Sequence, residues 1–205
     1  MKKIIICEGF NDGIFITQLF ERLGIQKNEV KLFRQEDVSL NEKKDAESKA
    51  LKTFMSGGTY NPKKYLVKLE GGKHSATKIL CRELKNCLQN IEGGLILLLD
   101  IDNSNAVKEV SDIIKKIKQN YSATTPLSLD ENKKKKNDHL HHSSIRISIA
   151  KTNEHIGDFQ IVLFSKSLEH SCKIEDTHTT EQRERLISSF IEKEKIVEFF
   201  NEIIK

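Results

Sequence analysis

Paired cysteine spacing and long apolar runs are both missing from this chain of 205 residues. The four cysteines include no C-x-x-C pair, so they predict no disulfide framework, and we expect reduced thiols in a cytoplasmic protein. No segment reaches the roughly 18 apolar residues of a membrane span. Glu8 interrupts the first apolar run too early for a secretion signal. We therefore expect neither export nor a membrane partner.

A strong excess of one charge sign is absent as well. Lysine and arginine number 34 and aspartate and glutamate 30, which gives a net charge of +4. Such a charge permits a nucleic-acid partner without requiring one. Apolar residues make up 37% of the chain, enough for a hydrophobic core, and no internal repeat divides it. We expect a single domain over residues 1–205, and the sequence indicates no oligomeric state.

Apolar runs that stop at carboxylates are the most informative feature that is present. Residues 4–7 are apolar and are followed by Glu8, and residues 95–99 are followed by Asp100 and, two positions later, Asp102. Such a run is typical of a buried parallel strand. Ligands of open α/β sheets bind at the carboxyl ends of the strands. Two such ends bring several acids together, where they would attract a divalent cation.

Strand and helix patterns alternate along most of the chain. Apolar residues every three or four positions predict a helix after each of the first three strands, and Asn11 is the expected N-cap of the first helix. Thr179 and Gln182 form a capping-box pattern before a further helix. This order predicts an α/β fold with a mostly parallel central sheet and helices on both faces. The predicted strands are residues 4–7, 65–69, 95–99, 145–149 and 159–164.

Three segments depart from this alternation. Residues 26–64 have few apolar residues and many charges, which predicts an insertion after the first helix, with one amphipathic helix near 41–55. Residues 123–144 are basic and rich in histidine, which favours a flexible loop. These histidines have no further ligand at zinc spacing, so no zinc site is predicted. Residues 165–205 form a C-terminal segment with helical patterns.

Two short motifs at the predicted strand ends resemble those of a known family. Residues from Glu8 to Asp12 match the E-G-x-x-D start of the TOPRIM domain, and Asp100 and Asp102 match its D-x-D motif. The resemblance covers about residues 2–119. It implies a TOPRIM or Rossmann-like sheet. The family includes topoisomerases, primases and nucleases, whose shared chemistry is phosphoryl transfer on nucleic acids with Mg²⁺.

The resemblance also implies a role for each acid. Glu8 would be a general acid or base, or a metal ligand, while Asp100 and Asp102 would be metal ligands. Asp12 would contribute to a second metal position, as in the nuclease branches. Mg²⁺ is the implied cofactor, with Mn²⁺ as a substitute. Taken without the resemblance, these acids are also explained as helix-terminal or loop residues, and Glu169, after the last predicted strand, is better explained as a loop residue.

Two basic features are candidates for phosphate contacts. Gly71, Gly72 and Lys73 follow the second predicted strand, and glycines allow a backbone to approach an anion. A solvated turn explains this lysine equally well. Four consecutive lysines are candidates for contact with a nucleic-acid backbone, although a solvated loop also explains them. They are Lys133, Lys134, Lys135 and Lys136.

The leading hypothesis is a Mg²⁺-dependent phosphoryl-transfer protein, nuclease-like, that acts on DNA or RNA. The alternative is a non-catalytic nucleic-acid-binding or assembly module that keeps the TOPRIM fold. It is favoured by Asn103, Ser104 and Asn105, which stand where many family members have a further acid or a glycine. Receiver-like and dehalogenase-like proteins also bind Mg²⁺ at strand ends. Glu8 and Asp12 on the first strand end do not match a receiver, however, and Asn103 does not match the dehalogenase motif.

Overall fold

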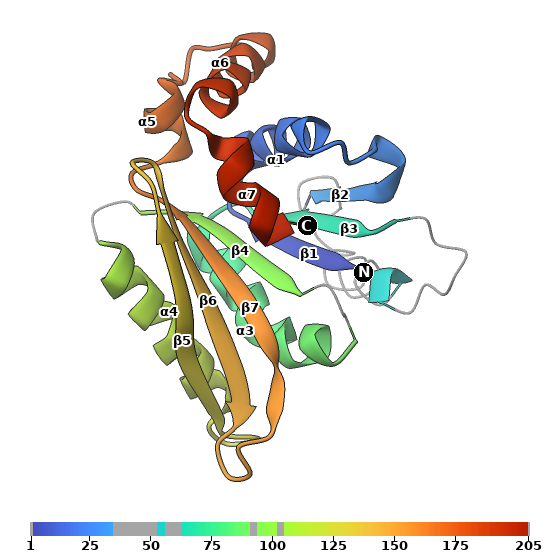
Figure 1. Cartoon of the computed structure of the whole chain (residues 1–205), viewed down its shortest axis with the longest axis vertical. Coiled ribbons are helices and arrows are strands. Elements are labelled where there is room, and N and C mark those ends of the chain that lie inside the picture. Colours follow the sequence, from blue (N-terminus) through green and yellow to red (C-terminus); the bar gives the residue numbers. More distant parts are fainter. Residues whose placement is uncertain (1, 35–52, 56–62, 91–93, 102–104, 205) are drawn as a thin grey trace.

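The computed structural model describes residues 2–34, 53–55, 63–90, 94–101 and 105–204. Within these residues the chain forms a seven-stranded sheet of order β2-β3-β1-β4-β7-β6-β5 (Figure 1). The α/β class and the mostly parallel sheet predicted from the sequence are confirmed. The strands are β1 (Lys3–Cys7), β2 (Val30–Arg34), β3 (Tyr65–Leu69), β4 (Leu95–Asp100), β5 (Leu127–Lys136), β6 (Leu140–Ile149) and β7 (His155–Phe164).

The central strands are parallel and buried on both faces. β1 lies between β3 and β4, and Cys7 is paired in register with Leu69 on one side and Leu98 on the other. Every residue of β1 is buried, and only the last residue of β4 is not. Branched apolar side chains suit such two-sided burial. The first and third strands predicted from the sequence therefore lie side by side, with their carboxyl ends at the same edge of the sheet.

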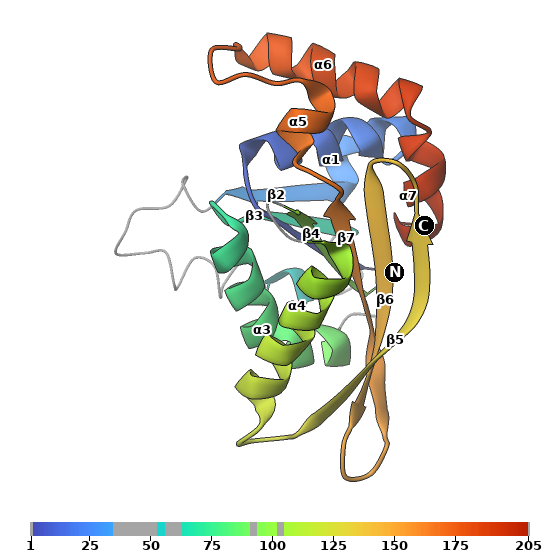
Figure 2. The same cartoon turned by 90° about the vertical axis from the view of Figure 1, so that its left-hand side faces the viewer.

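Helices cover both faces of the sheet (Figure 2). Because successive side chains of a strand point to opposite faces, Ile4 and Ile6 pack in one buried cluster and Ile5 and Cys7 in the other. The first cluster lies under α3 and α4, and the second under α1, α5, α6 and α7. The helices are α1 (Phe10–Arg22), α3 (Lys73–Asn90), α4 (Ala106–Tyr121), α5 (Leu168–Cys172), α6 (Thr180–Lys193) and α7 (Ile196–Ile204), with a 3₁₀ turn η1 (Lys27–Glu29) after α1.

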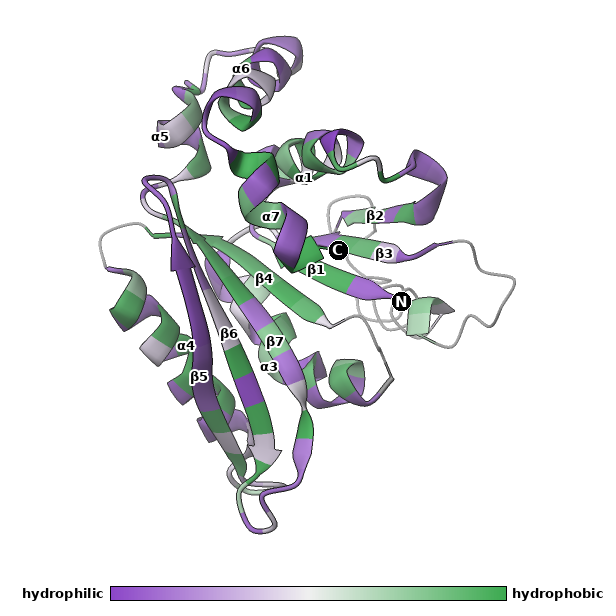
Figure 3. Ribbon diagram, viewed as in Figure 1, coloured by the Kyte–Doolittle hydropathy of each residue, from purple (hydrophilic) through white to green (hydrophobic). Residues whose placement is uncertain are grey.

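Residues 123–144 do not form the predicted flexible loop. Most of them belong to β5 and β6, which form an antiparallel hairpin whose register pairs Leu127 with Ile149. β6 in turn pairs antiparallel with β7, so the hairpin extends the sheet. The loop prediction was wrong because only the start of β5 alternates apolar and polar residues. The rest of this strand is hydrophilic on both faces (Figure 3), a pattern that resembles a loop in sequence.

The segment 26–64, predicted as an insertion, contributes an edge strand to the sheet. β2 pairs in parallel with β3, and Val30 is in register with Tyr65. The sequence pattern did not predict this strand, because β2 has no fully buried residue. The helix predicted at 41–55 lies outside the described residues except for 53–55, which are helical and include the buried Phe54.

Helix starts illustrate one correct and one wrong prediction. At α6 the Gln182 backbone N–H donates to Thr179 Oγ1 (3.3 Å) and the Thr179 N–H donates to Gln182 Oε1 (2.8 Å), which confirms the capping box. Asn11, predicted as the cap of α1, lies inside that helix. The N-cap is Gly9, whose N–H donates to Asp12 Oδ2 over 2.9 Å. The acid three positions along the helix therefore satisfies the backbone donor at its start.

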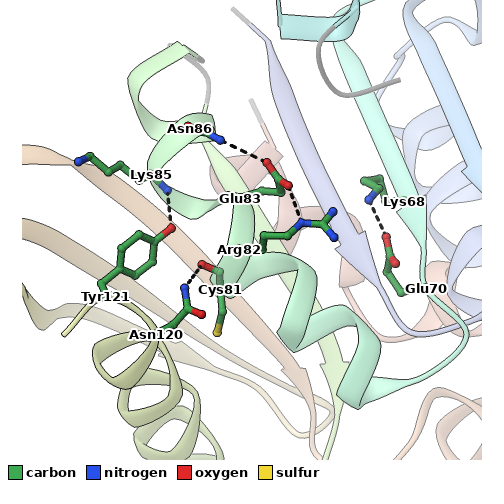
Figure 4. A network of polar contacts seen from close by, with 9 residues as sticks. All are labelled: Lys68, Glu70, Cys81, Arg82, Glu83, Lys85, Asn86, Asn120 and Tyr121. Carbon is green, nitrogen blue, oxygen red and sulfur yellow. Dashed lines mark hydrogen bonds and ion pairs between the residues drawn. The ribbon is translucent and has the colours of Figure 1, made fainter. Parts of the chain in front are cut away.

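Polar contacts fix α4 against α3 on their shared face of the sheet (Figure 4). The Lys85 backbone N–H donates to the Tyr121 hydroxyl (3.2 Å), and Asn120 Nδ2 donates to the Cys81 carbonyl (3.1 Å). Both contacts hold the last turn of α4.

The four cysteines of the chain are free and buried. In the part of the chain that the structure describes, no helix combines the length and apolar character needed to cross a bilayer.

Two buried lysines interact with the backbone or with a carboxylate. Lys68 on β3 is fully buried with Glu70, and its Nζ lies 2.8 Å from Glu70 Oε1 (Figure 4). Lys3 on β1 donates from Nζ to the carbonyls of Ile203 (3.0 Å) and Ile204 (2.6 Å) at the end of α7. Burial lowers the pKa of the Lys3 ammonium. The carbonyls are the partners that offset this burial, because the end of a helix carries partial negative charge.

Candidate carboxylate site

The ends of β1 and β4 are joined through two of the predicted acids. Glu8 follows β1 directly, and Asp100 is the last residue of β4. The Asp100 backbone N–H donates to Glu8 Oε1 over 2.7 Å. The Gly72 N–H donates to the Glu8 carbonyl oxygen over 2.8 Å, so the turn after β3 is joined to the same residue. The carboxyl ends of three neighbouring strands therefore meet at Glu8.

The carboxylate of Asp100 is held by the segment that follows β7. The Leu168 N–H, in the first turn of α5, donates to Asp100 Oδ1 over 3.1 Å. The register places Asp100 opposite Phe164, the last residue of β7. The Ile101 N–H then donates to the carbonyls of Phe164 and Lys166, both over 3.0 Å. The carboxylate is thus oriented by a backbone donor of a neighbouring element.

Asp12 is a buried acid within reach of other negative charges. Asp12 lies in the first turn of α1 and is only 6% exposed. Burial raises the pKa of the Asp12 carboxyl well above its ordinary value, and the charges of Asp100, Glu8 and Glu169 raise it further, while the hydrogen bond from Gly9 lowers it. Like charges oppose ionisation when they share a site with little water. The four acids therefore form one electrostatic unit.

Glu169 joins this unit from the far end of the sequence. Asn11 Nδ2 donates to Glu169 Oε1 over 2.7 Å, across 158 residues of chain. Arg183 Nη1 donates to Asn11 Oδ1 over 3.3 Å, so α6 supports the contact. The prediction of a loop residue was wrong, since Glu169 lies in the first turn of α5. Its position just after the last buried strand was the signal in the sequence. We call Glu8, Asp12, Asp100 and Glu169 the carboxylate cluster.

Two buried thiols lie near the carboxylate cluster, and burial and nearby negative charges raise the pKa of each. Burial, followed by the charges of Glu169 and Asp100, raises the pKa of the Cys172 thiol to about 12. Burial and the charges of Asp12, Glu70 and Glu8 raise the pKa of the Cys7 thiol well above its ordinary value. Neither thiol is a thiolate near neutral pH, so neither is a nucleophile of the site.

A metal ion is suited to this cluster by charge and by donor type. Its members offer carboxylate oxygens, the ligands that hard cations such as Mg²⁺ prefer. Asp102, the fourth predicted metal ligand, lies outside the described residues. Among the residues that are described, no three histidine, cysteine, aspartate or glutamate side chains are arranged so that they could hold a metal ion. A bound cation therefore requires Asp102, water ligands or a shift of the carboxylates.

The glycine turn predicted to bind phosphate lies beside Glu8. Gly71 and Gly72 have φ angles of 69° and 138°, which favour glycine. Lys73 starts α3, and its Nζ lies 3.5 Å from Glu109 Oε1 on α4. This lysine is therefore engaged in an ion pair between two helices rather than solvated in a turn. The four lysines 133–136 lie on β5, on both faces of the hairpin.

Comparisons of this chain with models of protein families, with curated proteins and with solved structures find no match.

Proposed function

We propose that this chain is a Mg²⁺-dependent phosphoryl-transfer protein that acts on nucleic acid, nuclease-like and of the TOPRIM type. The observation that carries the proposal is the buried Asp12, whose ionisation is opposed first by burial and then by the charges of three further carboxylates. Ionisation of such a group costs stability unless a cation offsets the repulsion. The E-G-x-x-D and D-x-D resemblance supports the same conclusion.

Each acid has a part in the proposed site. Asp100 and Asp102 are the principal ligands, and Asp12 and Glu169 add negative charge at a second position. Glu8 either binds the ion or moves a proton at the reacting phosphate. Bound Mg²⁺ would polarise a phosphoryl oxygen and lower the pKa of a water ligand. Backbone donors from Gly9, Asp100 and Leu168 hold three of the carboxylates in orientation, as outer-shell hydrogen bonds do at metal sites.

Cleavage assays test this function directly. Supercoiled plasmid, single-stranded DNA and structured RNA are incubated with the protein in Mg²⁺ or Mn²⁺ and in EDTA. We expect metal-dependent cleavage of at least one substrate, and its loss in the double variant Asp100→Ala/Asp102→Ala. The exposed Asp112→Asn on α4 is the matched control. Activity that survives the double variant rejects the site.

A binding module without turnover is the second candidate. The absence of a three-ligand arrangement among the described residues favours it. It predicts a gel shift in EDTA that weakens steeply with salt, together with no cleavage in either metal. The cleavage assay therefore distinguishes the two candidates, because only the enzyme produces cleaved nucleic acid.

A further inference from the structure

We propose that Lys134 and Lys136 bind the phosphates of a nucleic-acid strand in the cavity between α4 and the β5–β6 hairpin, and that Lys133 and Lys135 do not. This proposal rests on the proposed function, because it takes nucleic acid as the ligand. It deepens that function by assigning the surface on which the strand lies.

The cavity reaches the edge of the sheet that also carries the carboxylate cluster. It has a volume of about 850 Å³, within the range of sites that enclose small ligands. Ile101 and Ser165 line it, and they directly follow the ends of β4 and β7. Asp100 is the residue before Ile101. A strand held in the cavity would therefore approach the carboxylates at the same edge of the sheet.

A β-bulge decides which lysines face the cavity. Leu127 and Leu129 on β5 pack in the cluster under α4. The pairing register shifts between Glu131 and Lys133, so one extra residue enters β5 at that point. A bulge changes which face the following side chains point to. Without the bulge, Lys133 would lie on the same face of β5 as Glu131. With the bulge, Lys134 lies on that face instead.

The pairing across the hairpin agrees with this change of face. Lys134 is opposite Ser143 and Lys136 is opposite His141. Both partners line the cavity. Lys133, in contrast, is opposite Ser144, and this pair lines a separate hollow on the other face. The four consecutive lysines are thus divided between two faces.

The other two lysines lie on the opposite face of β5. Lys135 also borders the cavity, but its ammonium group lies on that opposite face, against α7. Lys135 Nζ lies 3.3 Å from Glu202 Oε2 and 5.3 Å from the ring centre of Phe199, both on α7. Its charge is therefore used to hold α7 to the hairpin. Lys133 lies on that face as well, away from the edge that carries Asp100.

The two cavity lysines are spaced for successive phosphates. Alternate residues of a strand are about 6.6 Å apart, a distance comparable with that between neighbouring phosphates of an extended nucleic-acid strand. Val107, which is 73% exposed on the first turn of α4, lines the same cavity and offers apolar contact to a base or sugar. Grooves for single strands combine positive charge with a surface that contacts the bases, usually an aromatic one; here Val107 offers an aliphatic surface.

Glu131 holds one of these lysines before a ligand arrives. Lys134 Nζ lies 2.7 Å from Glu131 Oε2, and the Ser143 hydroxyl donates to Glu131 Oε1 over 2.5 Å. A phosphate would compete with this carboxylate for the ammonium. Removing the carboxylate charge should therefore strengthen binding.

The test compares two double variants that lose the same charge from the same strand. Fluorescence anisotropy measures binding of a fluorescein-labelled single-stranded DNA of about 20 nucleotides, a length that exceeds one binding groove, in EDTA and over a range of salt. We expect Lys134→Ala/Lys136→Ala to weaken binding ~10-fold and to reduce the salt slope by about 1.4, since each phosphate contact on a single strand contributes ~0.7. Lys133→Ala/Lys135→Ala should change affinity by less than ~2-fold, the size of an effect on a remote surface charge.

Two further variants separate charge from folding. Lys134→Arg/Lys136→Arg keeps both charges and should keep most of the affinity, which excludes a hairpin that has simply unfolded. Glu131→Gln should tighten binding. Equal losses in the two alanine pairs, or a loss only in Lys133→Ala/Lys135→Ala, overturn the proposal.

The failures of the two proposals can be told apart because binding in EDTA requires no catalysis. Binding that depends on Lys134 and Lys136, with no cleavage in any metal, supports the inference and rejects the enzyme. Cleavage by a protein whose two lysine pairs behave alike supports the enzyme and rejects the inference. A wild-type chain that binds no nucleic acid rejects both.

Discussion

Asp12 is an acid whose ionised form the folded protein disfavours. Its folded pKa is raised above the ordinary value of 3.8, so the folded state binds the proton more tightly than the unfolded state. The free energy of unfolding must then fall as the pH rises from about that ordinary value through the raised pKa. Asp12→Asn removes this penalty and keeps an oxygen for the Gly9 N–H.

We therefore expect Asp12→Asn to be more stable than the wild-type protein at pH 7 in EDTA. The two proteins should converge below the ordinary pKa of aspartate, where Asp12 is protonated in both states. Urea unfolding at the two pH values measures the difference. A variant that is less stable than the wild type at pH 7 would contradict the assigned repulsion.

The buried pair of Lys68 and Glu70 makes a second prediction at this scale. Replacing one partner, as in Glu70→Leu or Lys68→Met, leaves the other charge buried without this ion pair and should cost about 3–5 kcal/mol. Lys68→Met/Glu70→Leu removes both charges and should cost much less than the sum of the two single variants. A double-mutant cycle by chemical denaturation gives the coupling. Additive losses would show that the pair contributes little.

At the scale of single elements, the start of α6 depends on one hydroxyl. Thr179 Oγ1 accepts from the Gln182 N–H, so Thr179→Ala should lower the free energy of unfolding by ~1 kcal/mol. Thr180→Ala, one residue later and exposed, is the control and should change stability by less than ~0.5 kcal/mol. Similar losses in the two variants would mean that the cap is not the cause.

The elements predicted from the sequence are those with a clear burial pattern. β3 has the predicted bounds, and β4 extends one residue further than predicted. The apolar run of β4 is unbroken up to Asp100, and that of β3 is interrupted only by Lys68. β2 and β5 were missed. Each lies at an edge of the sheet, where one side of a strand has no neighbour and the side chains need not alternate. Their sequences therefore lack the period of two that would reveal them.

The candidate site was predictable only in part, for a related reason. Adjacency of Glu8 and Asp100 follows from two parallel strands that end at carboxylates. The position of Glu169 depends on the turn into α5 and on Asn11, a partner 158 residues away. No local pattern encodes such a contact. The division of the lysines on β5 was equally hidden, since it depends on a bulge at Glu131 that only pairing with β6 reveals.

For the whole molecule, binding of a cation should be linked to stability. A ligand that binds only the folded state, at 100 times its dissociation constant, adds about 2.7 kcal/mol to the free energy of unfolding. We expect Mg²⁺ to raise the melting temperature of the wild-type protein, and EDTA to reverse the change. Asp100→Asn should lose the response, while Asp112→Asn should keep it. Thermal unfolding that is identical with and without Mg²⁺ and Mn²⁺ would count against a metal site.

The contact of Lys3 with the end of α7 joins positions that are 201 residues apart. On a ribosome, β1 is therefore made long before the helix whose carbonyls receive its lysine. At a synthesis rate of ~5–20 residues per second, that interval is roughly 10–40 s. Throughout it, Lys3 on β1 of the nascent chain lacks these carbonyl partners. The face of the sheet that α7 covers is also exposed until that helix is made. Efficient production of the protein thus depends on keeping incomplete chains from associating through this face.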